Sequence, residues 1–145
     1  MIATPSTLRL SAQERAWLTW LKTRTGARSY APLLRFALVL SLAEPRAPHP
    51  QALPADGLEV DWATLGGQHG EIYWACVVEC TTRHGLPAEE APRQLRAHLY
   101  RGIGLLRSDR RVGDAASAAA RTAPLFADVE PAPAVDGLEP EGDET

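Results

Sequence analysis

The side chains that could support catalysis are few and widely spaced in this sequence. His69, His84 and His98 do not lie at metal-binding spacings, so each is more typical of a hydrogen-bonding histidine than of a ligand. The chain contains neither a phosphate-binding Gly-x-x-x-x-Gly-Lys motif nor a His-Glu-x-x-His motif. Group transfer generally requires metal-binding carboxylates, an activated nucleophile or an ATP site. We therefore expect no enzymatic activity, no cofactor and no metal ion.

Two further pairs of residues could have a chemical role. His98 and Arg101 share one face of an expected helix, where they either grip a phosphate or, more simply, hold that helix against another. Cys76 and Cys80 are four residues apart, a spacing that differs from a redox Cys-x-x-Cys pair. The simpler interpretation places both cysteines in a core. The alternative, a persulfide relay, requires an exposed thiol with a lowered pKa.

Positive charge is concentrated in the first part of the chain. Residues 1–112 contain 14 Lys and Arg against 10 Asp and Glu, whereas residues 113–145 contain 1 against 8. Up to residue 43 the only acidic residue is Glu14, and the basic residues are Arg9, Arg15, Lys22, Arg24, Arg28 and Arg35. This distribution suits a polyanionic partner such as nucleic acid, although it also fits a solvated helix face.

The elements that must position these cations begin with a strand and a helix. Residues 6–11 alternate polar and apolar side chains, which predicts a half-buried strand. Ser11 and Glu14 form a capping-box pattern, so a helix should follow directly and run to about Thr25. Gly26 stands where a left-handed helix end is favoured.

The rest of the chain predicts three more helices. Ser29 is a good N-cap for a helix over residues 30–43 that is apolar almost all round, which suggests burial on most sides, often by a partner subunit. We expect a short strand over residues 57–60, a loop over 61–70, a helix over 71–84, and a last helix that opens at 87–90 and continues to about 106. Gly102 and Gly104 indicate a tight packing contact or a bend in that helix.

A strand followed by two helices resembles the ribbon-helix-helix DNA-binding unit. In that arrangement two chains pair their strands into an antiparallel ribbon that enters the major groove. The resemblance implies that Thr7, Arg9 and Ser11 face DNA. The N-terminus of the second helix, with Arg28 and Ser29, would bind a phosphate, and Lys22 and Arg24 would flank it.

Five stretches make a more specific resemblance. In order along the chain they are LRLS (8–11), LKTRTG (21–26), LRFALVLSLAEP (34–45), EIYWA (71–75) and HLYRGIG (98–104). They resemble the DndE family of the DNA sulfur modification, or DNA phosphorothioation, machinery, which includes a cysteine desulfurase and ATP-using partners. The resemblance implies a non-catalytic accessory subunit that binds duplex DNA, favours nicked duplex, and assembles into homo-oligomers, dimers or tetramers, beside other sulfur-modification proteins. A ribbon-helix-helix transcriptional repressor is the alternative.

The sequence thus predicts a mainly α fold in one domain over residues 6–112. A ribbon-helix-helix-like unit (6–45) is extended by two further helices and followed by a disordered acidic tail over residues 113–145. The chain has no apolar run of about 20 residues that could span a bilayer, and its start lacks the pattern of a signal peptide. We therefore expect a soluble, cytoplasmic protein that has no membrane partner.

Overall fold

A computed structural model describes residues 3–52, 54 and 56–109. Its elements are β1 (Thr7–Leu10), α1 (Ala12–Thr25), α2 (Tyr30–Leu42), β2 (Leu58–Asp61), α3 (Trp62–Gly66), a 3₁₀ turn (Gly67–His69), α4 (Gly70–Arg83), a second 3₁₀ turn (Ala88–Glu90) and α5 (Ala91–Ser108). The expected mainly α fold with a short N-terminal strand is confirmed. The predicted acidic tail, residues 113–145, lies outside the described residues.

Local sequence signals explain where α1 begins and ends. The Ser11 side chain accepts a hydrogen bond from the backbone of Glu14, and the Glu14 side chain accepts one from the backbone of Ser11. Gly26 ends the helix with φ of 78°, a left-handed conformation in which a side chain is strained. The predicted capping box and glycine end are both confirmed.

Strand β1 pairs with β2 of the same chain. The two strands are antiparallel, with Thr7 opposite Asp61 and Arg9 opposite Glu59. The expectation that β1 pairs with a second copy to form the ribbon is therefore corrected, because a strand 50 residues downstream takes that position. Gly57 makes the approach possible, since a Cβ there would stand 2.0 Å from the carbonyl oxygen of Leu10.

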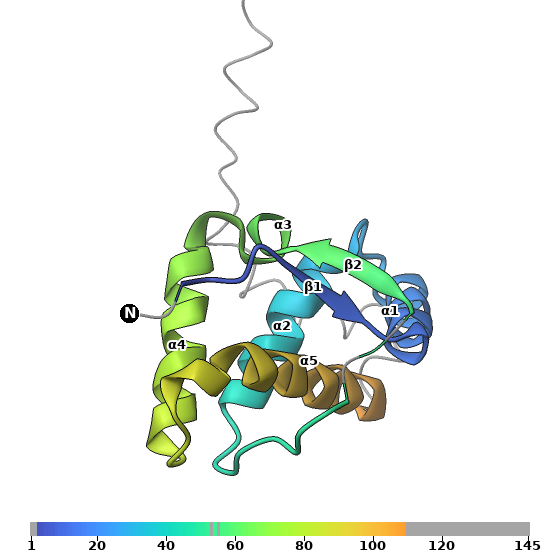
Figure 1. The fold of residues 1–145 in the computed structure, drawn as a ribbon. Coiled ribbons are helices and arrows are strands. Elements are labelled where there is room, and N and C mark those ends of the chain that lie inside the picture. The colour runs from blue at the N-terminus through green and yellow to red at the C-terminus, as the bar shows by residue number, and fades with distance from the viewer. Residues whose placement is uncertain (1–2, 53, 55, 110–145) are drawn as a thin grey trace, which may run out of the picture.

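The core forms around α2. This helix packs most extensively against α5 and also contacts α1, α3 and α4. Figure 1 shows α1 and α4 at opposite ends of the molecule, with α2 and α5 between them and the β1–β2 ribbon lying across one side. Leu34 and Leu38 are fully buried in this core. Elements of the same chain bury most of the apolar side chains of α2, whereas Val39, Leu40 and Leu42 stay partly exposed.

One predicted loop is helical. The sequence predicts a loop over residues 61–70, but residues 62–69 form α3 and a 3₁₀ turn, while Asp61 ends β2 and Gly70 begins α4. Trp62 and Leu65 are buried there, and Arg35 donates a hydrogen bond to the Leu65 carbonyl at 3.1 Å, which satisfies a carbonyl near the end of α3. The packing of these side chains outweighs the weak helix propensity of the glycines.

Gly102 marks a close helix crossing. A Cβ at this position would lie 1.9 Å from the backbone oxygen of Ala37 in α2, whereas a Cβ at Gly104 would meet no atom within 4 Å. The tight packing contact predicted from the sequence is confirmed at Gly102. No described helix is both long enough and apolar enough to cross a membrane.

Candidate nucleic-acid interface

The outer face of the β1–β2 ribbon carries acids as well as cations. Thr7 and Arg9 are exposed, as the alternation predicted, while Leu8 and Leu10 face the core. The strand register places Asp61 and Glu59 beside them on the same face, and both acids are exposed. Arg9 forms an ion pair with Glu59 at 3.4 Å. This face therefore carries one positive and two negative charges.

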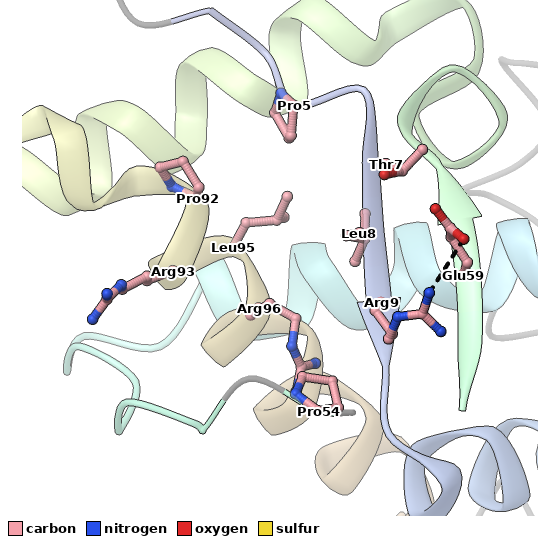
Figure 2. A pocket seen from close by; sticks show the side chains of 10 residues that line it. All are labelled: Pro5, Thr7, Leu8, Arg9, Pro54, Glu59, Pro92, Arg93, Leu95 and Arg96. Carbon is pink, nitrogen blue, oxygen red and sulfur yellow. Dashed lines mark hydrogen bonds and ion pairs between the residues drawn. The ribbon is translucent and has the colours of Figure 1, made fainter. Parts of the chain in front are cut away.

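A cavity of about 460 Å³ lies between β1 and the first turns of α5. Figure 2 shows its three arginines diverging: Arg9 turns to Glu59, and Arg93 points away from the strand. Arg96 is buried and donates to Glu14. Pro5, Leu8, Pro92 and Leu95 supply apolar walls. The arginines around this cavity do not converge on one point, so they form no common anion site.

Glu14 is withdrawn from the surface of α1. Its side chain is fully buried, and both of its oxygens accept hydrogen bonds from Nη1 of Arg96 at 2.9 Å. The two residues are 82 positions apart in the sequence. The capping box also uses this carboxylate, and the Ser11 hydroxyl takes part in the same network. Ser11 is thus engaged in the helix cap.

The exposed charged side chains of α1 and the following turn are therefore all cations. Glu14 is the only acidic residue between positions 12 and 30, and Arg96 neutralises it internally. Four cations remain at or near the surface: Arg15, Lys22, Arg24 and Arg28. We call these four residues the α1 basic surface. Lys22 and Arg24 also lie in the last turn of the helix, where positive charge favours the helix dipole.

Tyr30 sits beside this basic surface. The Lys22 ammonium lies 4.8 Å from the centre of the Tyr30 ring, and the Tyr30 hydroxyl is 3.0 Å from the Thr19 hydroxyl. The hydrogen bond with Thr19 lowers the pKa of Tyr30 below its ordinary value, and Arg15 and Lys22 lower it further. These contacts hold the start of α2 against the last turns of α1 and fix the position of Lys22.

The N-terminus of α2 completes the arrangement. Ser29 is its N-cap residue, as predicted, but the Ser29 side chain makes no capping hydrogen bond and no acid occupies the first turn. Arg28 and Ser29 are both exposed. Lys22, Arg24, Arg28 and Ser29 thus all lie in the last turn of α1 or the turn that leads to α2, although the Lys22 ammonium lies over Tyr30 and the Arg24 guanidinium over Trp20. Thr7 and Arg9 lie apart from them, on the ribbon.

Comparison with known proteins agrees with this fold and decides the family. The profile of the family described as DNA sulphur modification protein DndE matches residues 7–114, which is most of the chain. The chain belongs to the DndE family. The match begins at β1 and includes all of the described helices.

Solved structures share the DndE fold. A crystal structure of DndE from Escherichia coli B7A, described as involved in DNA phosphorothioation modification, is 24% identical with a TM-score of 0.59 and covers 72% of this chain and 99% of its own. A DndE variant with glycine-to-lysine substitutions, also described as involved in DNA phosphorothioation, is 23% identical with a TM-score of 0.58 and covers 73% of this chain and 100% of its own. A search of curated proteins finds no match.

The best-formed polar cluster of this DndE-family chain is internal. Ser41 of α2 is 2.8 Å from Nδ1 of His98, and Arg101 donates to both the Ser41 hydroxyl and its carbonyl, each at 2.8 Å. Ser41 and His98 are fully buried. Burial lowers the pKa of His98 to about 4, and the charges of Arg101 and His84 act in the same direction. His98 and Arg101 thus hold α5 against α2, the simpler of the two roles expected.

The two cysteines differ in their surroundings. Cys80 is buried and lies 3.6 Å from Nδ1 of His84, as a core residue should. Cys76 is exposed, which corrects the expectation that both cysteines belong to the core. Cys76 and Cys80 share a face of α4, but the neighbouring elements cover only the end of that face that carries Cys80. Among the described residues, no group of three His, Cys, Asp or Glu side chains is arranged to hold a metal ion.

The decisive feature of this site could not be read from residue spacing. Arg96 lies on α5 and belongs to no motif, yet its ion pair with Glu14 neutralises the only acid of α1. The one available signal was the capping-box role of Glu14, which places its carboxylate against its own helix end.

Proposed function

We propose that this chain is a non-catalytic DNA-binding subunit of a DNA phosphorothioation complex. The observation that carries the proposal is the α1 basic surface, in which the helix's only carboxylate is buried against Arg96. Four cations with no exposed acid beside them attract a phosphate backbone more strongly than the mixed charges of the ribbon do. The DndE family and its fold supply the sulfur-modification context.

The proposed contacts follow from the geometry. Lys22, Arg24 and Arg28 bind phosphates, and the free N–H groups behind Ser29 at the start of α2 bind another. Arg15 extends this surface toward the start of α1. Thr7, Arg9 and Ser11 were predicted from the sequence as DNA contacts, and we expect them to contribute less. The two exposed acids Glu59 and Asp61 repel phosphates from the ribbon, and the helix cap engages Ser11.

The non-catalytic role is supported by where the reactive side chains lie. The Ser41–His98 pair, a hydroxyl beside an imidazole, is sealed in the core and held by Arg101, and the Cys80 thiol beside His84 is buried as well. Such a pair holds two helices together and is out of reach of a phosphodiester. Sulfur transfer is assigned to partner proteins of the complex.

We further propose that the chain works as a homo-oligomer beside other sulfur-modification proteins. Support comes from a groove of about 900 Å³ between the end of α2 and α4, where Val39, Leu42 and Ile72 contribute apolar surface. Ile72 is 61% exposed, unusual for a large aliphatic side chain. A measured mass by light scattering decides between monomer, dimer and tetramer, and an Ile72→Asp variant should shift that mass downward.

A ribbon-helix-helix repressor gains no support from this fold. Such a repressor pairs its first strand between two chains and presents that ribbon to the major groove. Here β1 pairs with β2 of its own chain, and the exposed face of the ribbon has an excess of negative charge.

The test is a binding titration across salt concentrations. Fluorescent duplexes of one sequence, intact or with a single nick, are titrated with the full chain from about 50 to 200 mM salt, a range over which neutralising several phosphates costs a large factor in affinity. We expect affinity to fall steeply with salt and to be higher for nicked duplex. If the chain does not bind DNA, or binds it with an affinity that does not change with salt, the DNA-binding role is contradicted. Equal affinity for both duplexes removes the preference for nicks.

A further inference from the structure

A second exposed side of α1 carries aromatic side chains together with a cation. Trp17, Trp20 and Arg24 are spaced three, four and seven residues apart, so they share one helix face. Trp20 is 38% exposed. Apart from Ile72, it is the only large apolar side chain that counts as exposed in the described part of the chain. A tryptophan at the surface of a helix gives up much of the stabilisation that burial of its ring would provide.

The neighbours of these rings are cations. The guanidinium carbon of Arg24 lies 4.9 Å from the centre of the Trp20 ring. Arg107 of α5 lies 4.6 Å from the centre of the Trp17 ring, and Trp17 also contacts Tyr100 with ring centres 5.7 Å apart. Trp17 is thus anchored between two helices. Trp20 lies one helical turn further along, backed by Arg24.

The charge around Trp20 indicates the kind of partner it would meet. α1 has no exposed acid, and Arg24 and Arg107 are both exposed. An apolar protein surface gains nothing from docking beside these unpaired cations, whereas a nucleic acid supplies phosphates for the arginines and flat bases for the ring. Stacking of a base on an aromatic side chain is the usual way in which proteins hold unpaired nucleotides.

We propose that Trp20, backed by Arg24, is a stacking site for an unpaired nucleobase. The site takes a base that a gap, a frayed end or a single-stranded segment leaves accessible, while Arg24 and Arg107, the cations beside Trp20 and Trp17, hold the adjoining phosphates. This inference rests on the proposed DNA-binding function and adds to it the form of DNA that is recognised. Duplex bases that remain stacked within a helix offer no face to Trp20.

The experiment compares three DNA probes and three variants of the full chain. The probes are an intact duplex, the same duplex with a one-nucleotide gap opposite 2-aminopurine, and a single strand. The variants are Trp20→Ala, Trp20→Phe and Thr23→Ala, the last as a control that shortens another exposed side chain of α1. Affinity is measured by fluorescence anisotropy, and stacking by quenching of the 2-aminopurine emission.

We expect Trp20→Ala to weaken binding to the gapped duplex and the single strand by about tenfold, within the range measured for one base–aromatic stack. Its affinity for the intact duplex should change by less than about twofold. Trp20→Phe should keep most of the affinity and of the quenching, because the phenyl ring still stacks. Thr23→Ala should leave the preference for gapped over intact duplex unchanged.

Other results overturn the inference. An equal loss on all three probes shows that Trp20 supports the helix without selecting a base. Unchanged binding, together with a fall in the mass of the oligomer, shows that Trp20 covers a second copy of the chain. In both cases Lys22→Ala still weakens binding to every probe, so the proposed function survives. If the wild-type chain binds none of the probes, both the DNA-binding function and the stacking site are wrong.

Discussion

Arg9 and Lys22 have the same formal charge, but their neighbours give them different electrostatic roles. Arg9 faces Glu59 at 3.4 Å, with Asp61 on the same strand face, whereas Lys22 belongs to a helix whose single acid is buried. A cation beside exposed acids adds little to the attraction of a distant phosphate, because the local field nearly cancels. The partners of each residue, more than its type, decide which cations can bind DNA.

The first prediction compares these two cations by the same substitution. Lys22→Ala should weaken binding to duplex DNA severalfold and reduce the magnitude of the salt slope by about 1, the effect of losing one phosphate contact. Arg9→Ala should change affinity by less than about twofold. Both are measured by anisotropy titration at several salt concentrations. A larger loss of affinity for Arg9→Ala than for Lys22→Ala would show that the ribbon, and not α1, is the DNA interface.

A second prediction concerns the buried Arg96–Glu14 pair. Arg96→Met leaves the fully buried Glu14 carboxylate without its partner, which should destabilise the fold by about 3–5 kcal/mol. The double variant Glu14→Gln with Arg96→Met should recover part of this loss, because no unpaired charge remains. Arg93→Met, an exposed arginine on the same helix, is the control and should be nearly neutral. Urea unfolding provides the free energies, and a loss for Arg96→Met no larger than the control's would show that the pair is unimportant.

A third prediction follows from the pKa of His98. Burial lowers that pKa to about 4, while an unfolded histidine has a pKa near 6.5. Between these two pH values the unfolded chain therefore binds a proton that the folded chain does not bind. Stability should therefore fall as pH drops from about 6.5 to about 4, by roughly 3 kcal/mol in total, and this contribution should be constant below pH 4. The free energy of unfolding is measured in urea at steps of pH. His98→Asn should remove this part of the slope, and a variant that keeps the full slope contradicts the assignment to His98.

At the scale of elements, the four longer helices follow from local patterns, whereas α3 and the strand pairing do not. The capping box, Gly26 and the apolar period predicted α1, α2, α4 and α5 to within a few residues. The sequence also predicted β2 as a short strand, yet it did not reveal that β2 pairs with β1. Pairing depends on how closely two distant segments approach, and here Gly57 and the shared core decide that approach.

The crossing of α2 and α5 provides a fourth prediction, with a matched pair of glycines. Gly102→Ala should destabilise the fold by more than the roughly 1 kcal/mol that alanine gains in helix propensity, because its Cβ would overlap the Ala37 carbonyl. Gly104→Ala has open space around it and should stabilise the fold by up to about 1 kcal/mol. Thermal unfolding of both variants measures the difference. Equal effects would show that the two helices can move apart at no cost.

At the scale of the whole molecule, charge is divided along the chain. The full sequence has a net charge of -3, although residues 1–112 carry an excess of cations and residues 113–145 contain eight acids. A long-range negative field slows the approach of DNA wherever it originates, and salt screens it within about 10 Å at 0.1 M.

The fifth prediction tests this division. Replacing the eight acids of residues 113–145 by their amides should raise the rate of association with DNA severalfold at low salt. The difference between variant and wild type should disappear as the salt concentration rises, because the effect is electrostatic. Stopped-flow anisotropy measures the rates. A rate increase that persists at high salt points to a direct contact in place of a field effect.

The sequence by itself determined α1, α2, α4 and α5, the caps of α1, the tight contact at Gly102 and the excess of cations near the start of the chain. These features depend on neighbours within a few positions, where side-chain periodicity and capping preferences operate. Only the tertiary structure decided that β1 pairs within its own chain, that Cys76 is exposed and that Glu14 is neutralised by a residue 82 positions away. Contacts of this kind follow from how the helices pack in space, and the local pattern around either partner does not specify them.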